Sequence, residues 1–356
     1  MYSYLVKLTP LEPYFFGGNI NFFWKSQKNN KDKDRGSRYL IKSRDLPQQT
    51  TLLGMIRKEI LMSEEGAMIK VNDEEVPFKY KYNIRKYGES EIEYIGKLIG
   101  KSSFNMKKPP SEYGIIKNIS SVFIMDKRDN IYIKTPYDYN KNGYKPFVYK
   151  DGILDGYDPK AGITDCFMNV DTFNLCTEKI FRDFKKVGID KDDKGSTKED
   201  SYFKAIFKVM EKEFSFAFVL NTKEELRLKN KIVYMGAKKS AFKMELKKVE
   251  NNYFKIPKED NKIILLSDTY IDENIYDKCV YAITNTIDFN NLQTTYGKNH
   301  KMKKTLVKFT LLKSGSVLYP KTNQDRKYIL DKINKENIQK IGYNHIWQVG
   351  GLRDVK

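Results

Sequence analysis

Three aspartates form the first cluster in the sequence that could do chemistry. Asp151, Asp155 and Asp158 lie close enough together to share a divalent cation, as the carboxylates of metal-dependent nucleases do. Two glycines and a proline interrupt the segment, which favours a solvated turn over a metal site. The sequence also lacks a glycine-rich nucleotide loop, a nucleophile elbow and the paired histidines of zinc proteases. We therefore expect no metal, no cofactor and no catalytic residue.

His300 is the second candidate, in a basic segment that runs from Tyr296 to Lys304. Metal-free RNA cleavage needs a general acid and a general base, and His, Tyr and Lys side chains can serve. A basic loop with one histidine is more often an electrostatic clamp for phosphate. We therefore assign His300 to RNA binding and keep a metal-free endoribonuclease as the alternative function. The other histidine, His345, is expected to be a half-buried structural ring.

Three polar turns carry donors and cations suited to phosphate. The first opens an expected helix, whose unpaired N–H groups and partial positive charge attract anions. With its flanks it supplies Arg38, Lys42, Arg44, Gln48, Gln49, Thr50, Thr51 and Arg57. The second turn supplies Lys238, Lys239 and Ser240, and the third supplies Lys313, Ser314 and Ser316. Helix capping or an ordinary surface turn explains each one alone, whereas three in one basic chain favour RNA binding.

The charge of the whole chain agrees with a polyanionic partner. Its 356 residues include 65 Lys+Arg and 46 Asp+Glu, a formal net charge of +19. Such an excess attracts nucleic acid and predicts salt-sensitive binding, although a lysine-rich composition alone can also produce it. Aromatic residues make up 13% of the chain, and several crowd around Gly17 and Gly18. Those rings either stack on RNA bases or belong to the core.

Apolar spacing predicts one well-defined helix. We expect it after Pro47, capped by Thr50 or Thr51. Its apolar stripe consists of Leu52, Leu53, Ile56, Ile60 and Leu61. Gly54 within the helix is expected to allow close packing against a sheet.

The remaining pattern mixes strands and helices. Residues 2–9 alternate as a first strand, with Tyr4, Val6 and Leu8 on one face. Further strands are expected at 122–125, 131–134, 214–220, 231–235, 262–267, 279–284 and 305–312. Residues 25–45 are expected to be a polar loop or RNA-facing arm. Residues 185–200 are expected to be a polar turn, and apolar residues at helical spacing predict a short helix over 203–210. Without strict β-α alternation, this pattern predicts an α+β fold.

Length and composition suggest two domains in a cytoplasmic protein. We expect an N-terminal domain over 1–210 and a C-terminal domain over 211–356. No apolar run approaches the roughly 20 residues of a membrane span. The first residues indicate a strand rather than a signal peptide, and three cysteines without a CxxC pair fit a reducing compartment. We therefore expect no membrane association.

Taken in order, these segments resemble the RAMP-superfamily subunit that holds the 5′ handle of the guide RNA (crRNA) in type III-B CRISPR (Cmr) effector complexes. The motifs that carry the resemblance are Thr9–Gly18, Leu46–Arg57, Val187–Lys191, Met235–Lys239, Leu312–Tyr319 and Ile341–Asn344. Gly236-Ala-Lys-Lys departs from the family pattern, which usually has a second glycine and arginines. Lysine lacks the bidentate fork of arginine, so contacts at that turn are expected to be looser.

The resemblance implies two ferredoxin-like (RRM-like) domains with inserted loops and a thumb-like hairpin. It implies a non-catalytic subunit that binds the crRNA 5′ handle, and through the crRNA the target RNA, in antiviral defence. It adds Lys191 and Asn344 to the RNA-binding residues. The implied protein partners are the large polymerase/nuclease-like subunit and the backbone RAMP subunit of the Cmr complex. The equivalent subunit of a neighbouring type III system is a further alternative.

Overall fold

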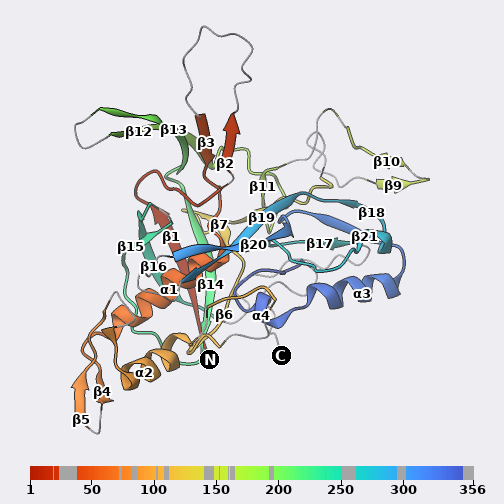
Figure 1. Cartoon of the computed structure of the whole chain (residues 1–356). Coiled ribbons are helices and arrows are strands. Elements are labelled where there is room, and N and C mark those ends of the chain that lie inside the picture. The colour runs from red at the N-terminus through yellow and green to blue at the C-terminus, as the bar shows by residue number, and fades with distance from the viewer. Residues whose placement is uncertain are drawn as a thin grey trace.

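The computed structural model describes residues 1–18, 20–23, 38–71, 74–81, 86–101, 103–107, 112–139, 148–151, 153–158, 160, 165–191, 196–236, 238–250, 262–294 and 302–347. Helices and strands are mixed without regular alternation, which confirms the α+β class (Figure 1). None of the described helices has the length and apolar character that crossing a bilayer requires.

Within the described residues, the largest sheet is antiparallel and has eight strands. Its order is β11 (Phe167–Asn169), β8 (Ile131–Lys134), β7 (Phe123–Asp126), β14 (Phe214–Thr222), β1 (Tyr2–Pro10), β16 (Ser240–Lys248) and β15 (Lys231–Met235), and β6 (Ile116–Ile119) also pairs with β14. The strands expected at 2–9, 122–125, 131–134, 214–220 and 231–235 are confirmed.

Each face of this sheet has its own core. On one face, Val6, Leu8 and Phe216 lie in one buried cluster with Leu52 and Ile56 of α1 (Gln49–Ser63), so the apolar stripe predicted for that helix is confirmed. Gly54 is exposed, and a Cβ there would meet nothing within 4 Å, so the close packing expected at that glycine is wrong.

The other face packs against the C-terminal part of the chain. Leu5 and Ala217 of the sheet lie in a second buried cluster with Val317 and Trp347. Because β14, β15 and β16 follow residue 210 and pair with β1 or with one another, the sheet crosses the boundary expected between residues 210 and 211.

The C-terminal part has its own small sheet and helices. In the described residues this sheet consists of β17 (Ile263–Ile264), β21 (Val317–Pro320) and β18 (Cys279–Ile283), preceded by a short 3-10 helix (Tyr276–Lys278). Ile329 and Ile333 of α3 (Asn323–Ile333) share a third buried cluster with Leu318. The helix α4 (Glu336–Gln339) follows, and β19 (Thr286–Thr294) pairs with β20 (Met302–Leu312) as a separate ribbon.

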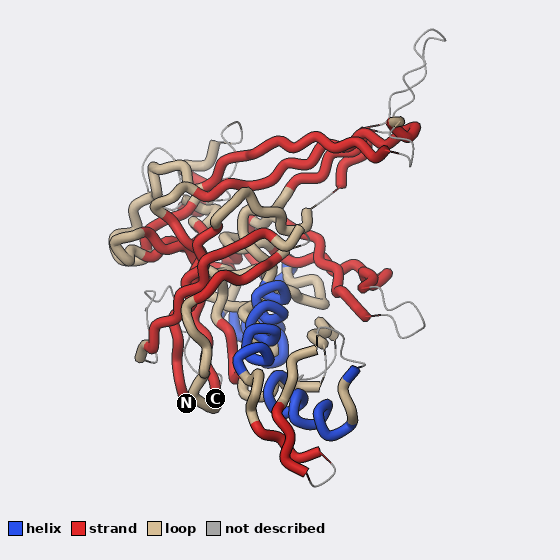
Figure 2. Tube along the Cα trace, turned by 90° about the vertical axis from the view of Figure 1, so that its left-hand side faces the viewer, coloured by secondary structure: helices blue, strands red, loops and turns tan. Residues whose placement is uncertain are grey.

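Long strands project from this body as an arm, best seen in Figure 2. The order is β12 (Phe181–Lys191), β13 (Thr197–Met210), β3 (Arg38–Lys42) and β2 (Ile20–Phe23). The helix expected over 203–210 is therefore wrong, since those residues belong to β13. The polar turn expected over 185–200 is wrong over most of its length, because β12 continues to 191 and β13 begins at 197. Residues 38–42 of the expected loop also form a strand.

Two short hairpins are separate from these sheets in the described residues. β4 (Met68–Val71) and β5 (Glu74–Pro77) form a hairpin beside α2 (Glu89–Ile99), which packs against α1. β9 (Val148–Lys150) and β10 (Ile153–Asp155) form another hairpin. Of the three aspartates considered as metal ligands, Asp155 ends β10, Asp151 lies between the two strands, and Asp158 follows the hairpin. No group of three His, Cys, Asp or Glu residues in the described part of the chain could hold a metal ion.

Candidate nucleic-acid interface

The first predicted turn is the N-terminus of α1. Gln48 is the N-cap residue, in extended conformation and without a side-chain cap, so the capping expected from Thr50 or Thr51 is wrong. The helix starts at Gln49, which is 4% exposed. Its amide lies where it can accept the N–H of Val122 and donate to the carbonyl of Ile341. Gln49 therefore ties the start of α1 to the C-terminal part of the chain.

Two loops run beside this helix start. The N–H of Phe16 donates to Ser43 Oγ at 2.9 Å, and the N–H of Arg44 donates to the carbonyl of Phe16 at 3.0 Å. These bonds fix residues 12–16 alongside residues 42–46, directly before α1. The rings of Tyr14, Phe15 and Phe16 are all buried, so in this loop the aromatic residues belong to the core.

The second predicted turn, at residues 236–240, packs against the same loop. Gly236 has a φ of +77°, and a Cβ there would lie 2.5 Å from the carbonyl oxygen of Phe15. Only glycine allows that approach without strain. Ser240 Oγ donates to the carbonyl of Pro13 at 3.4 Å. Residues 12–16 therefore contact both residues 42–49 and the described residues of the 236–240 turn, and we call this set of loops the loop ridge.

The third predicted turn lies across a small pocket from the start of α1. Gly315 has a φ of +91°, and a Cβ there would lie 2.7 Å from the carbonyl oxygen of Thr135. The N–H of Ser314 donates to Asp268 at 3.1 Å, and burial raises the pKa of that carboxyl group. The pocket, of about 40 Å³, is lined in part by Gln48, Asp268 and Ser314. The fold thus brings the first and third turns together.

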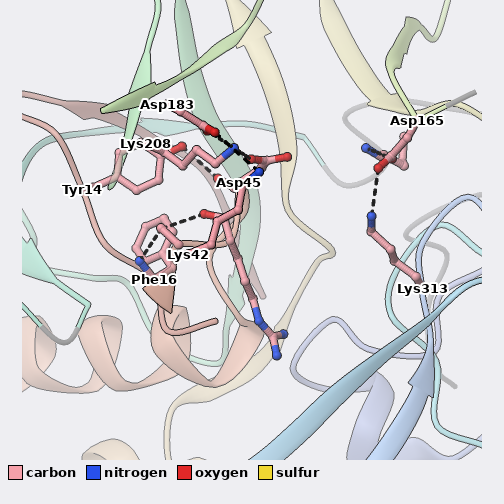
Figure 3. A network of polar contacts seen from close by, with 11 residues as sticks. Tyr14, Phe16, Lys42, Asp45, Asp165, Asp183, Lys208 and Lys313 are labelled. Carbon is pink, nitrogen blue, oxygen red and sulfur yellow. Dashed lines mark hydrogen bonds and ion pairs between the residues drawn. The ribbon is translucent and has the colours of Figure 1, made fainter. Parts of the chain in front are cut away.

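A buried lysine joins the arm to the loop ridge (Figure 3). Lys208 of β13 forms ion pairs with Asp45 at 2.6 Å and with Asp183 at 2.7 Å, while Lys42 lies 3.5 Å from Asp183. Burial lowers the pKa of Lys208, but the two carboxylates outweigh burial and raise it overall. The hydroxyl of Tyr14 donates to the carbonyl of Asp45 at 2.9 Å. This network holds residues 42–45 in place.

A second ion-pair cluster lies at the third turn. Asp165 pairs with Lys313 at 3.0 Å (Figure 3). It also pairs with Lys134. Burial raises the pKa of Asp165, but Lys134 and then Lys313 outweigh it, so the pKa is lowered overall. These partners and Lys208 were not predicted from the sequence. No local pattern marks them, because each pair joins residues far apart in the chain.

The other predicted residues fall into distinct groups. Exposed at the ridge are Lys42, Lys238 and Lys239. Buried and used in turn structure are Ser240, Ser314 and Ser316. Partly buried at the start of α1 are Thr50 and Thr51. Arg38 and Lys191 contribute backbone to the arm, and His300 lies outside the described residues.

Two arginines and an asparagine have partners within the protein. Arg44 donates to the carbonyl of Asp288 in β19, which ties the ridge to the β19–β20 ribbon. The guanidinium of Arg57 lies 5.0 Å from the ring centre of Tyr113. Asn344 is fully buried, and its amide bonds to the backbone of Tyr270 on both sides. In this structure the side chain of Asn344 therefore positions a C-terminal turn.

His345 is a structural ring, as the sequence analysis expected. Its Nδ1 faces the N–H of Ser121 at 3.4 Å, and its Nε2 lies 3.0 Å from the carbonyl of Gln339. This pairing requires the neutral ring with the proton on Nε2. Burial lowers the pKa to about 4.

Comparisons with known proteins give one family. A family model described as CRISPR-associated protein (Cas_Cmr3) matches residues 150–349, more than half of the chain. A solved chain from "Cryo-EM structure of the Type III-B Cmr-beta bound to cognate target RNA" is 14% identical, with 97% of this chain and 96% of that chain covered and a TM-score of 0.49. A chain from "Crystal structure of Csm1-Csm4 cassette in complex with AMPPNP" is 10% identical, with 90% and 88% covered and a TM-score of 0.37. A sequence comparison with curated proteins finds no match.

Proposed function

The chain belongs to the Cas_Cmr3 family of CRISPR-associated proteins, and we propose that it is the subunit that binds the crRNA 5′ handle in a type III-B effector complex. In this proposal the protein acts without catalysis, in the cytoplasm, in antiviral defence. It docks against the large polymerase/nuclease-like subunit and the first backbone RAMP subunit. The sheets that pack on α1 and on α3 would be the two ferredoxin-like units, and the arm would be the thumb-like hairpin.

One observation carries the proposal: the loops that hold separate basic turns contact one another or line the same pocket. Lys238 and Lys239 lie at one end of the loop ridge, Lys42 and Arg44 lie along it, and Lys313 lies across the pocket from its other end. A phosphate backbone could follow this line of cations past the start of α1, where the helix dipole is positive. Because the turns are held by backbone contacts at Gly236 and Gly315, the cations are spaced before RNA arrives.

The alternative function, metal-free cleavage of repeat RNA, needs a histidine beside the scissile phosphate. His345 does not suit that role, because both ring nitrogens face the protein backbone and the ring stays neutral near pH 7. His300 is the remaining candidate on the alternative account. Incubation of the pure protein with repeat RNA in EDTA separates the two functions, since cleavage that is lost in His300→Gln would favour the nuclease.

Handle-specific binding tests the proposal directly. The protein would be titrated with crRNA that carries its native 5′ handle and with crRNA that carries a scrambled handle, each at a low and a high salt concentration. A preference for the native handle that persists at high salt, with both RNAs intact, supports the proposal. Equal binding of both RNAs that collapses with salt would reduce the protein to a general polyanion binder and contradict it.

A further inference from the structure

An exposed apolar strip lies at the β15 edge of the large sheet, on the face opposite to α1. Tyr234 and Ile232 are each 55% exposed, whereas the alternate residues Val233 and Met235 are buried at 1% and 3%. The strand pairing places Tyr234 opposite Ala241, and the N–H of Leu11 donates to the carbonyl of Ala241 at 3.0 Å. Leu11 is 53% exposed. We call Leu11, Ile232, Tyr234 and Ala241 the edge strip.

The edge strip adjoins one end of the loop ridge. β15 leads directly into the turn that carries the exposed Lys238 and Lys239. Lys243 lies opposite Ile232 and pairs with Glu245 at 2.9 Å. The carboxylate of Glu12 accepts the N–H of Ala241 at 2.8 Å, so it is used by the backbone of the turn. The ring of Tyr234 therefore lies on the strand that leads into the turn with the lysines that we assign to phosphate.

We propose that Tyr234 is a stacking platform for an unpaired nucleobase of the RNA whose phosphates contact Lys238 and Lys239. This inference rests on the proposed function. It adds a residue that would bind RNA by stacking on a base, without recognising the identity of that base or the charge of the phosphates. A flat ring on a strand keeps its orientation, and every base has a π face that can stack on it. Ile232 and Leu11 flank the ring with apolar side chains. The nucleotide beyond the two lysines would thus leave the phosphate path and lie on the sheet.

An RNA base fits the edge strip better than a protein surface does. Stable protein interfaces usually bury about 800 Å² on each partner and have an apolar centre. The edge strip offers only four partly exposed apolar side chains, bordered by Lys238, Lys239 and Lys243. Because β15 is the last strand of its sheet, an added strand from another protein is the competing occupant.

Three variants separate these occupants. Tyr234→Ala removes the ring, Tyr234→Phe keeps it, and Ile232→Thr changes the same exposed edge without touching the ring. Each would be titrated with crRNA that carries 2-aminopurine at successive handle positions, because stacking quenches this base. We expect Tyr234→Ala to raise Kd at least about fivefold, the lower end of a single stacking contact, and to lose quenching at one position. Tyr234→Phe should bind like the native protein, and Ile232→Thr, which keeps the ring, should raise Kd less than Tyr234→Ala does.

Each possible outcome decides the inference. Unchanged Kd and unchanged quenching in Tyr234→Ala would overturn the stacking site, while handle preference of the native protein would still support the proposed function. Absence of handle preference in the native protein would overturn both. If Tyr234→Ala binds RNA normally but no longer co-assembles with the other subunits of its complex, the edge strip is a protein-docking surface and the inference is wrong.

Discussion

Replacing His345 by glutamine should remove a pH dependence from the stability of the protein. In the folded chain the ring is neutral: Nδ1 faces the N–H of Ser121, and the Nε2 proton faces the carbonyl of Gln339. A second proton on Nδ1 would point at the N–H of Ser121. Burial disfavours the charged ring and lowers the pKa of His345 from 6.5 to about 4. The hydrogen bond to the backbone of Gln339 offsets only part of that effect.

The sign and size of the effect follow from these two pKa values. Below pH 6.5 the unfolded chain binds a proton at His345, whereas the folded chain does so only below about pH 4. The free energy of unfolding must therefore fall as the pH drops through this window. Linkage between the two values gives a loss of about 2 kcal/mol between pH 7.5 and pH 5. Glutamine can still donate to the carbonyl of Gln339, but it does not titrate.

Urea unfolding at pH 7.5 and pH 5 measures this difference. The native protein should lose about 2 kcal/mol more than His345→Gln over that interval. His300→Gln is the matched control, because it makes the same change at the other histidine of the chain. The carboxyl groups are common to all three proteins, so their titration cancels in the comparison. Equal losses in all three would refute the assignment of His345 as a buried neutral ring.

Three further substitutions test the support of the candidate site. Lys208→Met should lower the free energy of unfolding, measured by urea unfolding, by about 1 to 3 kcal/mol. This is less than the full cost of breaking a buried ion pair, because the side chains of Asp45 and Asp183 are 41% and 38% exposed. Lys238→Ala with Lys239→Ala should weaken handle binding and flatten the salt slope by up to about 1.4, at about 0.7 per lost phosphate contact to a single strand. Gly315→Ala should cost about 1 to 3 kcal/mol in thermal unfolding, because its positive φ and the adjacent carbonyl both oppose a Cβ.

The first and the third of these substitutions have a matched control. Lys212→Met removes an exposed lysine next to the end of β13 and should leave stability unchanged. Gly54→Ala adds a Cβ in open space within α1 and should stabilise the protein by up to about 1 kcal/mol. If Lys208→Met is no more destabilising than its control, the buried network does not hold the ridge. A lysine double variant with an unchanged salt slope, or a Gly315→Ala protein as stable as the native one, would contradict the corresponding part of the site.

The sequence predicted those elements whose apolar residues follow one spacing, either that of a strand or that of a helix. β1 alternates and α1 has a single stripe, so both were predicted correctly. β13 was mistaken for a helix because Ile206 and Phe207, which point to opposite faces of the strand, are both buried. An apolar residue on each face imitates helical spacing. The aromatic and β-branched content of the segment was the signal that favoured a strand.

Other features had a local signal that was missed, or none. α2 has an acidic first turn and Glu91 at the position that completes a cap with the N–H of Gly88, so its sequence did indicate a helix. The ordered motifs predicted the family, which the family match confirms. The partners of Lys208 and Lys313 could not be predicted, because tertiary folding alone brings Asp45, Asp183 and Asp165 to them.

The central claim is that the RNA handle lies along the loop ridge. Photo-crosslinking of handle RNA that contains thiouridine, followed by mass spectrometry of the attached peptides, tests it most directly. We expect crosslinks in peptides that contain residues 236–240, 42–49 or 313–316. Crosslinks confined to α3, α2 and the β4–β5 hairpin, with none in those peptides, would contradict it.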